Sequence, residues 1–570
     1  MKPSTYVSPV YPYRRPPELD QGGQGNCPVV IVGGGPTGLT AAVDLAQQGV
    51  RCVLLDDNDT VSVGSRAICF AKRTLEVFDR LGCGDRMLAK GVTWQVGKVF
   101  SRERQIYEFN LLPEGGHKMP AFINLQQYYV EQYLVERAQQ LASLADLRWR
   151  HRVVGVQSRP DTTRVQVRTE DGDYWLDCEY LIVADGANSD LRRMLDLACQ
   201  GQVFNDHFLI TDVVMEAPFP TERWFWFDPP FNPNQSVLLH RQPDNVWRID
   251  FQLGPGADTD AAIDESAIRE RIARMLGPDA EYKLEWVSVY TFRCQKMDSF
   301  RHNRVFFADD AAHQVSPFGA RGANGGIQGI DNLCWKLVRV LRGEAPDALL
   351  ESYDLEQQQT ARENIRNSTR STDFITPKNH ISRVFRDCTL ELAEHYPFAR
   401  TLVNSGRLSR PCHYRGSPLS TPDDPSFGGG AAPGTPMPDA PVMRDGRQGW
   451  LLNLFGDQFA LLVDARVSDS AARRLAQTLG RLQRRVPELR LVLVGPDAGE
   501  PAPAGSTVIS DPEGLVVRRY GLSPGAAYLI RPDQYVCARW TEPDPDAIET
   551  AVRVALGAAG QPREVSHAQA

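Results

Sequence analysis

The sequence lacks several features that would place it in a specialised class of protein. Its 570 residues include 11 cysteines, an odd number with no C-x-x-C pair, so neither a disulfide framework nor a zinc site is indicated. No stretch reaches the roughly 20 apolar residues that span a bilayer, and residues 1–26 contain no apolar core of signal-peptide length. Lys and Arg are dispersed in a chain of net charge -8, which argues against a nucleic-acid surface. We therefore expect a cytoplasmic protein that acts on small molecules, without a metal, nucleic acid or membrane.

A chain of this length exceeds the size at which one hydrophobic core keeps growing, so two or three packed units are expected. Residues 204–300 are aromatic-rich and alternate, as in RWFWFDPPFNPNQSVLLH, which is typical of a sheet. That sheet interrupts a first domain, which comprises residues 27–203 and returns with helices at 301–415. Residues 1–26 are predicted to be an irregular arm, and residues 416–440, dense in Gly, Pro and Ser, a linker.

Residues 441–570 are predicted to form a separate α/β domain. The segments WLLNLF, FALLVDA, RLVLVG and AAYLIRP are its predicted strands, and SAARRLAQTLGRLQRR and DAIETAVRVALG are its predicted helices. In the first domain, residues 128–144 have the apolar spacing of a helix, and residues 165–167, 180–183 and the run RVFFADDAAH indicate strands.

A glycine-rich loop opens the first domain. The segment CPVVIVGGGPTGLTAAVDLAQQGVRCVLLDD indicates a strand, a turn, a helix and a second strand. In this context a G-x-G-x-x-G turn offers backbone N–H groups and a helix N-terminus to a pyrophosphate. A carboxylate at the end of the second strand suits the ribose hydroxyls of an adenosine. The predicted nucleotide-binding residues are Gly33, Gly35, Pro36, Thr37, Gly38, Asp56 and Asp57. The loop alone does not distinguish FAD from NAD, and a glycine turn that only packs helix on strand is the alternative.

Two further loops each follow a buried strand, and they carry a resemblance. Residues 185–192 read D-G-A-N-S-D-L-R, and residues 309–313 read D-D-A-A-H, followed by SPFGARGANGGIQGIDNLCWKL. With the glycine loop, this pattern resembles the single-component flavoprotein aromatic hydroxylases, in the branch of 3-(3-hydroxyphenyl)propionate hydroxylase and phenol hydroxylase. The resemblance covers nearly the whole chain. It implies a Rossmann-like FAD-binding domain of the glutathione-reductase type, an inserted substrate sheet and a thioredoxin-like C-terminal domain.

The resemblance also implies a cofactor, a reaction and roles for individual residues. FAD would be reduced by NADPH or NADH, and O2 would add to it as a C4a-hydroperoxyflavin that hydroxylates a phenolic ring in aromatic catabolism. A homodimer is the family expectation. The residues that would contact the cofactor are Arg66, Gln127, Asp185, Asp310, Pro317, Gly322, Ala323 and Asn324, with Pro317 at the flavin face. A helix N-cap is the alternative for Asp310, and loop punctuation is the alternative for the glycines.

One departure from the family pattern lies beside the predicted cofactor. The family usually has Gly before the ribityl aspartate, whereas this chain has Asp309. A second carboxylate there would weaken FAD binding. In the C-terminal domain, Cys537 is the only cysteine between Gly428 and the end of the sequence, so packing or dimerisation is a better interpretation than thiol exchange.

No motif marks the residues that handle the substrate. His240, Tyr290 and Arg293 lie on predicted strands of the sheet and are our catalytic candidates, together with Pro317. Histidine has a pKa suited to proton transfer, although a satisfied core or edge histidine is the commoner case. The run from Trp224 to Trp226 either walls an aromatic pocket or packs in the strand core.

Two other functions are compatible with the same loops. A Baeyer–Villiger oxygenase or a dehalogenase-type hydroxylase would use the same flavin site on a different substrate. A non-catalytic escort protein would keep the fold and lose the cofactor. The intact glycine and aspartate positions argue against the escort protein, and products would separate the oxygenases.

Overall fold

The computed structural model describes residues 4–558 except 65, 255, 404–407, 468, 496–502 and 504. The chain divides into two compact units. The first comprises Met1–Pro113, Met119–Asp331 and Thr360–Arg410, and the second comprises Glu114–Lys118, Asn332–Gln359 and Pro411–Ala570. The predicted domain bounds stay a prediction, because a compact unit reflects packing and need not coincide with a domain.

The first unit contains an eight-stranded, largely parallel sheet. Its strands are β1 (Gln24–Val32), β2 (Cys52–Asp56), β8 (Ala145–Trp149), β9 (Arg152–Ser158), β10 (Thr163–Thr169), β11 (Gly172–Val183), β17 (Arg301–His302) and β18 (Val305–Phe307). The order is β17-β18-β11-β1-β2-β8, with β10 and β9 added beside β11. Pairs between β18, β11, β1, β2 and β8 are parallel. The carboxyl ends of these strands therefore meet at one edge, where open α/β sheets bind ligands.

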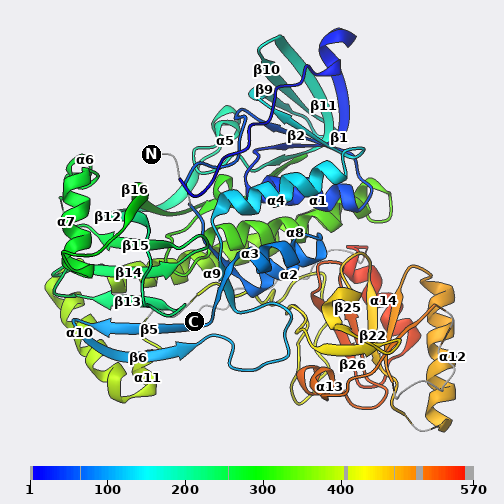
Figure 1. The fold of residues 1–570 in the computed structure, drawn as a ribbon. Helices are drawn as coiled ribbons and strands as arrows, with labels where there is room; N and C mark the ends of the chain where they lie inside the picture. The colour runs from blue at the N-terminus through cyan, green and yellow to red at the C-terminus, as the bar shows by residue number, and fades with distance from the viewer. Residues whose placement is uncertain are drawn as a thin grey trace. The chain divides into compact units, whose positions relative to one another are not determined.

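Helices α1 (Pro36–Gln47) and α4 (Gln127–Gln140) pack on this sheet, and α5 (Asp190–Met194) lies beside β9 (Figure 1). The first unit also contains α2 (Lys72–Arg80), α3 (Gly84–Lys90) and the start of α8 (Gly322–Leu341). Asp331 on α8 accepts hydrogen bonds from Arg73 and Arg80 on α2, at 2.9 and 2.6 Å. Arg80 also pairs with Asp44 on α1 at 2.9 Å. These charges are buried and mutually paired, so they hold the three helices in register.

A second eight-stranded sheet in the first unit is the predicted substrate sheet. Its strands are β5 (Val96–Ser101), β6 (Arg104–Asn110), β12 (Cys199–Val214), β13 (Arg223–Phe227), β14 (Ser236–Arg241), β15 (Val246–Gln252), β16 (Lys283–Met297) and β19 (His313–Gln314). The order is β19-β16-β12-β15-β14-β13-β5-β6. The sheet extends beyond residues 204–300, because β5 and β6 come from residues 96–110.

The two faces of the substrate sheet differ. One face carries Trp224, Trp226 and Trp247, which pack in a core with Ile268 and Ile272. The two isoleucines belong to α7 (Glu265–Leu276), which follows the short helix α6 (Thr259–Ala262). Strand-core packing is therefore the correct interpretation of the Trp224–Trp226 run. The opposite face is left for a cavity.

The remaining elements of the first unit include a three-stranded sheet of β3 (Cys69–Ala71), β7 (Phe122–Asn124) and β4 (Val92–Trp94), and the 3-10 helix η2 (Asp309–Ala311) after β18. Helix α9 (Glu351–Ile375) follows η3 (Asp347–Leu350) in the second unit and ends in the first, where α10 (His380–His395) and α11 (Pro397–Arg400) come next. The N-terminal arm is irregular up to η1 (Pro17–Gln21). It is nevertheless anchored, because Tyr6 stacks on Tyr128 at 4.1 Å and Thr5 hydrogen-bonds Glu285.

The second unit contains a five-stranded mixed sheet. Its strands are β22 (Ala460–Asp464), β23 (Arg490–Val494), β24 (Thr507–Ile509), β25 (Ala527–Ile530) and β26 (Val536–Trp540), in the order β24-β23-β22-β25-β26. Its helices are α12 (Asp469–Arg485), α13 (Leu515–Tyr520) and α14 (Pro545–Ala555). Three of the four predicted strands and both predicted helices are confirmed.

The predicted strand WLLNLF is wrong. A hairpin of β20 (Pro441–Arg444) and β21 (Arg447–Trp450) ends at Trp450, and Leu451–Leu454 form the 3-10 helix η5. Leu451 and Leu452 are both buried, which a strand with one exposed face does not allow for consecutive residues. Residues 416–440 form no regular helix or strand, as expected of a linker, yet Leu419 and Met437 are buried.

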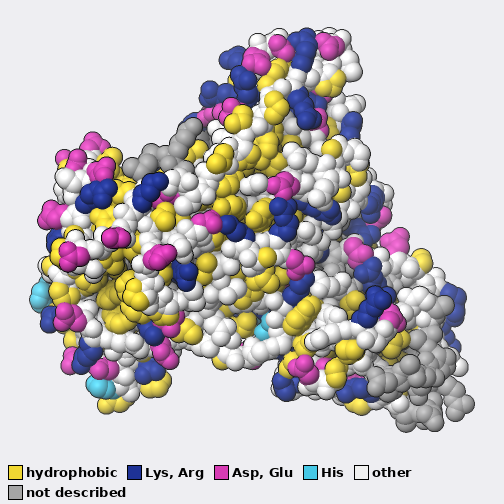
Figure 2. Space-filling view, viewed as in Figure 1, with side chains coloured by type: hydrophobic (Ala, Val, Ile, Leu, Met, Phe, Trp, Pro, Cys, Tyr) yellow, Lys and Arg dark blue, Asp and Glu magenta, His cyan; other side chains and the backbone are white. Residues whose placement is uncertain are grey.

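The surface shows no concentration of one charge on the face seen in Figure 2, where acidic and basic side chains are interspersed. Among the helices that the structure describes, none is both long and apolar enough to cross a membrane.

Candidate active site

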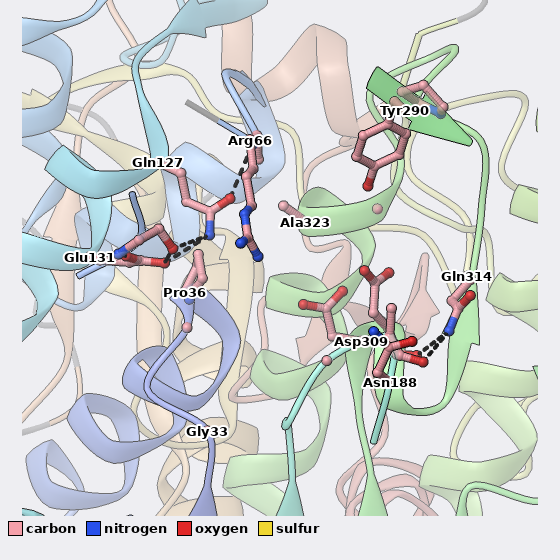
Figure 3. Close-up of a pocket in the computed structure, with 18 of the residues that line it drawn as sticks. Gly33, Pro36, Arg66, Gln127, Glu131, Asn188, Tyr290, Asp309, Gln314 and Ala323 are labelled. Carbon is pink, nitrogen blue, oxygen red and sulfur yellow. Dashed lines mark hydrogen bonds between the residues drawn. The ribbon is translucent and has the colours of Figure 1, made fainter. Parts of the chain in front are cut away.

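A cavity of about 1100 Å³ lies in the first unit. Its walls come from the glycine turn after β1, the loops after β11 and β18, the start of α8, and the open face of the substrate sheet (Figure 3). All the predicted site residues line it except Thr37 and Gly38. The fold thus brings together side chains that lie as far apart in sequence as Gly33 and Asn324.

The glycines of the turn differ in the space that surrounds the position of a Cβ atom. A Cβ on Gly33, whose φ is 111°, would lie 2.2 Å from the Ala184 carbonyl oxygen, and a Cβ on Gly38 would lie 2.0 Å from the Gly33 carbonyl oxygen. Both glycines are therefore required by the turn itself. A Cβ on Gly35 would meet nothing within 4 Å. The protein does not demand glycine there, whereas a ligand that approaches the backbone would.

The acidic residues after β2 lie at the cavity wall. One carboxylate oxygen of Asp56 accepts a hydrogen bond from the Gly34 N–H, and the other accepts from the Asn58 N–H at 2.8 Å. Asp56 therefore holds the glycine turn as well as facing the cavity. Asp57, beside it, also lines the cavity.

The loop after β11 presents a carboxylate with a free oxygen. Asp185 accepts from the Leu191 N–H at 3.2 Å through Oδ2, while its Oδ1 is buried and finds no partner among the described residues. Burial raises the pKa of Asp185. Arg192 donates to the carbonyl oxygens of Ala311 and Ala187, at 2.7 and 3.0 Å. Arg192 does not line the cavity and instead braces this loop against the loop after β18.

Two adjacent carboxylates follow β18 and have different surroundings. Asp309 has a φ of 54°, in the region that favours glycine, and its Oδ2 accepts from Thr37 Oγ1 at 2.7 Å. Its side chain also lies against Gly326 of α8, where a Cβ would come within 2.5 Å of it. Asp310 has no such partner, and its removal from solvent, together with the neighbouring Asp309, raises its pKa. Asp309 therefore links α1 to α8, and Asp310 faces the cavity.

The start of α8 reaches the cavity through backbone and small side chains. Pro317, Gly322 and Ala323 line the wall, so N–H groups at the positive end of the helix dipole face the enclosed space. The Asn324 side chain is fully engaged elsewhere. Its Oδ1 accepts from the Ala71 N–H at 2.8 Å and its Nδ2 donates to the Cys69 carbonyl oxygen at 2.8 Å. Any ligand contact of Asn324 would therefore use its backbone.

A hydrogen-bonded group on α4 holds the loop that carries Arg66. Gln127 accepts from the Ala67 N–H at 3.0 Å and donates to Glu131 at 2.8 Å (Figure 3). Glu131 also accepts two hydrogen bonds from Ser62, both at 2.6 Å. Burial raises the pKa of Glu131. Gln127 is thus a positioning residue for the Arg66 loop.

The open face of the substrate sheet carries a row of polar side chains. On adjacent strands, His240 stands opposite Arg248, and Arg248 stands opposite Asp212. Arg248 and Asp212 form two hydrogen bonds, at 2.8 and 3.2 Å. Arg223, at the start of β13, and Asp250, two residues after Arg248, line the same cavity. We define these five residues as the polar row.

The three catalytic candidates on the sheet all line the cavity, in unequal surroundings. His240 is 2% exposed, and burial, with Arg223 and Arg248, lowers its pKa well below the ordinary value. Tyr290 is 41% exposed, and the pKa of its hydroxyl is raised by desolvation and then by Asp310. Arg293 is exposed at the wall. A neutral imidazole that resists protonation and a phenol that resists ionisation are both poor bases, so the geometry favours hydrogen bonding by these groups.

Comparison with known proteins identifies the family of this chain. The family model described as FAD binding domain (FAD_binding_3) matches residues 26–368, more than half of the chain. A 6-methylpretetramide 4-monooxygenase from Streptomyces rimosus is 30% identical over 552 residues, which cover 92% of each chain. The chain belongs to this FAD-binding family.

Other proteins similar to this chain are also hydroxylases or monooxygenases. A 3-(3-hydroxy-phenyl)propionate/3-hydroxycinnamic acid hydroxylase from Mycolicibacterium gilvum is 26% identical over 520 residues, 90% of this chain and 88% of the relative. The flavin-dependent monooxygenase PieE, solved with FAD and substrate, has a TM-score of 0.77 at 23% identity and covers 94% of this chain and 99% of its own. The predicted membership among flavoprotein monooxygenases is confirmed, and the protein is an FAD-dependent monooxygenase of aromatic compounds.

The cavity fits FAD. The open space at Gly35, the unpartnered Oδ1 of Asp185 and the carboxylate of Asp310 are features that the protein leaves unsatisfied around the cradle. A dinucleotide offers a pyrophosphate for the turn and hydroxyl groups for the two carboxylates. The roles of the individual residues stay predictions.

Among the residues of the cavity wall that sequence analysis missed are Glu131, Arg223, Arg248 and Asp250. Arg248 and Asp250 alternate with buried Trp247, Ile249 and Phe251. That period of two is the available signal, because polar residues at alternate positions of an apolar strand share one face. Arg223 and Glu131 have no comparable local signal.

Proposed function

We propose that the protein hydroxylates a phenolic ring, with NADPH or NADH as the reductant and O2 as the oxidant. The observation that carries the proposal is that one cavity joins the FAD cradle to the open face of the substrate sheet. FAD, when bound, supplies the transfer of reducing equivalents from the nicotinamide and the activation of O2. The residues that would hold it are those of the glycine turn, Asp185, Asp310 and the backbone at the start of α8.

The substrate side of the cavity suits an electron-rich ring. Phe208, Ile210 and Leu238 line it beside the polar row and supply apolar surface for a ring. Arg223, which is not paired with a carboxylate among the described residues, provides a positive charge there, which favours the ionised form of a phenol and so makes its ring more electron-rich. His240, neutral at pH 7, offers a hydrogen bond to the phenolic oxygen.

The test is oxidation of NADPH and NADH by the purified yellow protein with single-ring and polycyclic phenols. Flavin absorbance is followed, and hydroxylated product is separated from hydrogen peroxide. The expected result is phenol-stimulated turnover with a ring-hydroxylated product. Lactone, ester or dehalogenated products would contradict ring hydroxylation and favour the other oxygenases. A protein that cannot be reconstituted with FAD would contradict the proposal altogether.

Three further parts of the proposal rest on family resemblance. A homodimer, a cytoplasmic location and a role in aromatic catabolism stay predictions. Sedimentation of the purified protein tests the first of these directly.

A further inference from the structure

We infer that Arg223 and His240 form a binding subsite for an anionic oxygen of the substrate, so that the enzyme selects aromatic compounds that carry a carboxylate or an ionised phenol. The inference rests on the proposed function and names the substrate class that it leaves open.

The first observation is that the polar groups of the subsite have no partner. Arg223 is 5% exposed and His240 is 2% exposed. The buried atoms Nε of Arg223, Nδ1 of His240 and Oδ1 of Asp250 make no hydrogen bond with any residue that the structure describes. Arg223 also forms no ion pair within the described part of the chain. Buried polar groups are normally paired, and an unpaired buried charge is unfavourable until a ligand completes it.

The second observation is that the neighbouring charges are already matched. Arg248 is held by Asp212 through two hydrogen bonds, and it also donates to the Arg66 carbonyl oxygen at 3.1 Å. Asp212 is 1% exposed and is committed to that pair. Arg223 is therefore the cation of the polar row that is not engaged by a carboxylate.

The third observation is the placement of the subsite. Trp224 pairs with Leu239 across β13 and β14, so Arg223 and His240 flank that pair at the same end of the two strands. Both line the cavity that also contains the FAD cradle. A guanidinium next to an imidazole, beside the apolar wall of Phe208 and Leu238, matches a flat ring with an acidic oxygen at its edge.

Asp250 sets the charge of the subsite. Its carboxylate lies among Arg223, Arg248 and Asp212 and near Cys69, and Asp250 stands opposite Leu238 on the paired strand, two residues before His240. Burial raises the pKa of Asp250 to about 6, with Asp212 adding to the rise and the arginines opposing it. A carboxylate close to Arg223 competes with an anionic ligand, so removing its charge strengthens the subsite and removing the charge of Arg223 abolishes it.

The test measures binding to the yellow holoenzyme by equilibrium dialysis, without turnover. One probe pair is 3-(3-hydroxyphenyl)propionate and its primary amide, which differ in a carboxylate. The other is 4-nitrophenol and 4-nitroanisole, which differ in the ability to ionise. The wild-type protein is expected to bind the anionic member of at least one pair at least about tenfold more tightly than the neutral member. The pair that shows the preference identifies the carboxylate or the phenolate as the source of the anion.

Two variants and a matched control locate the preference. Arg223→Gln is expected to abolish it, and Asp250→Asn to increase it by at least about twofold. Arg241→Gln is the control, because Arg241 follows His240 on β14, lies over Trp247 at 5.8 Å and does not line the cavity. Flavin absorbance verifies that each variant is folded and loaded.

Every result decides the inference. It is overturned if the wild type shows no anion preference, if Arg223→Gln keeps the preference, or if Arg241→Gln loses it equally. If Arg223→Gln does not fold, a failure of Asp250→Asn to strengthen anion binding overturns it. Hydroxylation without anion preference would reject the subsite and leave the proposed function standing. Anion-selective binding without a hydroxylated product would do the opposite.

Discussion

Two groups of buried charged residues, one in each compact unit, differ in how many of their possible hydrogen bonds are made within the described structure. In the second unit, Glu356 accepts from Arg531 at 2.7 Å, Ser417 at 2.6 Å, Lys336 at 2.9 Å and Asn332 at 2.6 Å. In the first unit, Arg223, His240 and Asp250 of the polar row keep buried atoms with no hydrogen-bond partner in the described part of the chain. Burial is similar in the two groups, so burial alone does not separate a structural charge from one that is available to a ligand. The number of unmade hydrogen bonds does.

The electrostatics follow the same division. Burial alone would raise the pKa of Glu356, but Arg531 and Lys336 hold it well below its ordinary value. The pKa of Asp250, with less compensation, is raised. The Glu356 group, whose hydrogen bonds are made within the protein, therefore keeps its carboxylate ionised at neutral pH. The polar row leaves hydrogen bonds that a substrate can make.

The largest expected effect tests this contrast through stability. Glu356→Gln leaves Arg531 and Lys336 incompletely paired in the interior, so it should lower the free energy of unfolding by about 3–5 kcal/mol. Arg223→Gln removes a buried charge that forms no ion pair with any described residue, so it should not lower the free energy of unfolding by more than about 1 kcal/mol. Urea unfolding of the FAD-free proteins measures both. Equal destabilisation by the two changes would show that the polar row is structural.

The second prediction applies the contrast to the glycine turn. Gly35→Val places a side chain in space that the protein leaves open, so the variant should fold and bind FAD at least about 100-fold more weakly. Gly38→Val forces a side chain onto the Gly33 carbonyl oxygen and should reduce stability as well. Flavin absorbance after dialysis against FAD, together with the thermal midpoint, separates the two outcomes. A Gly35→Val protein that stays yellow would contradict a ligand at this position.

The third prediction concerns the adjacent carboxylates after β18. The folded-state pKa of Asp310 is raised, so its contribution to stability is fully present below the unfolded-state pKa and is lost as the pH rises. The FAD-free protein should therefore lose stability through Asp310 as the pH rises from about 4 to 8. Asp310→Asn should remove this loss, as thermal midpoints at pH 5 and 8 would show. Asp309→Asn should reduce the loss only in part, because Asp309 adds to the raised pKa of Asp310 while burial remains the larger cause. An unchanged pH dependence in Asp310→Asn would refute the assignment.

The smallest expected effect is at Tyr290. The raised pKa of its hydroxyl means that it stays protonated, so Tyr290→Phe should change kcat by no more than about twofold, whereas loss of a general base costs roughly 100-fold or more. Steady-state turnover with a hydroxylated phenol as product provides the measurement. A large loss of kcat whose pH profile shifts with the change would make Tyr290 a catalytic residue.

Much of the nucleotide side was predictable because its information is local. The glycine turn lies between β1 and α1 within one continuous segment, and the loops with Asp185 and Asp310 each follow a buried strand. Strand, loop and helix occur in succession there, so spacing along the chain already specifies the geometry. The side chain of Asn324 shows the limit, since its bonds to residues 69 and 71 depend on a strand some 250 residues earlier in the sequence.

The sequence by itself therefore determined the cradle for FAD and the alternation of strands in the substrate sheet. Only the tertiary structure decided that Arg248 forms an ion pair with Asp212 while Arg223 forms none with the described residues. The physical reason is that pairing of buried charges depends on the register of β12, β13, β14 and β15, which are joined by turns and loops of differing lengths. A shift of one residue in any of these strands would move its polar side chain to the opposite face of the sheet. The local sequence of each strand does not specify which register is adopted.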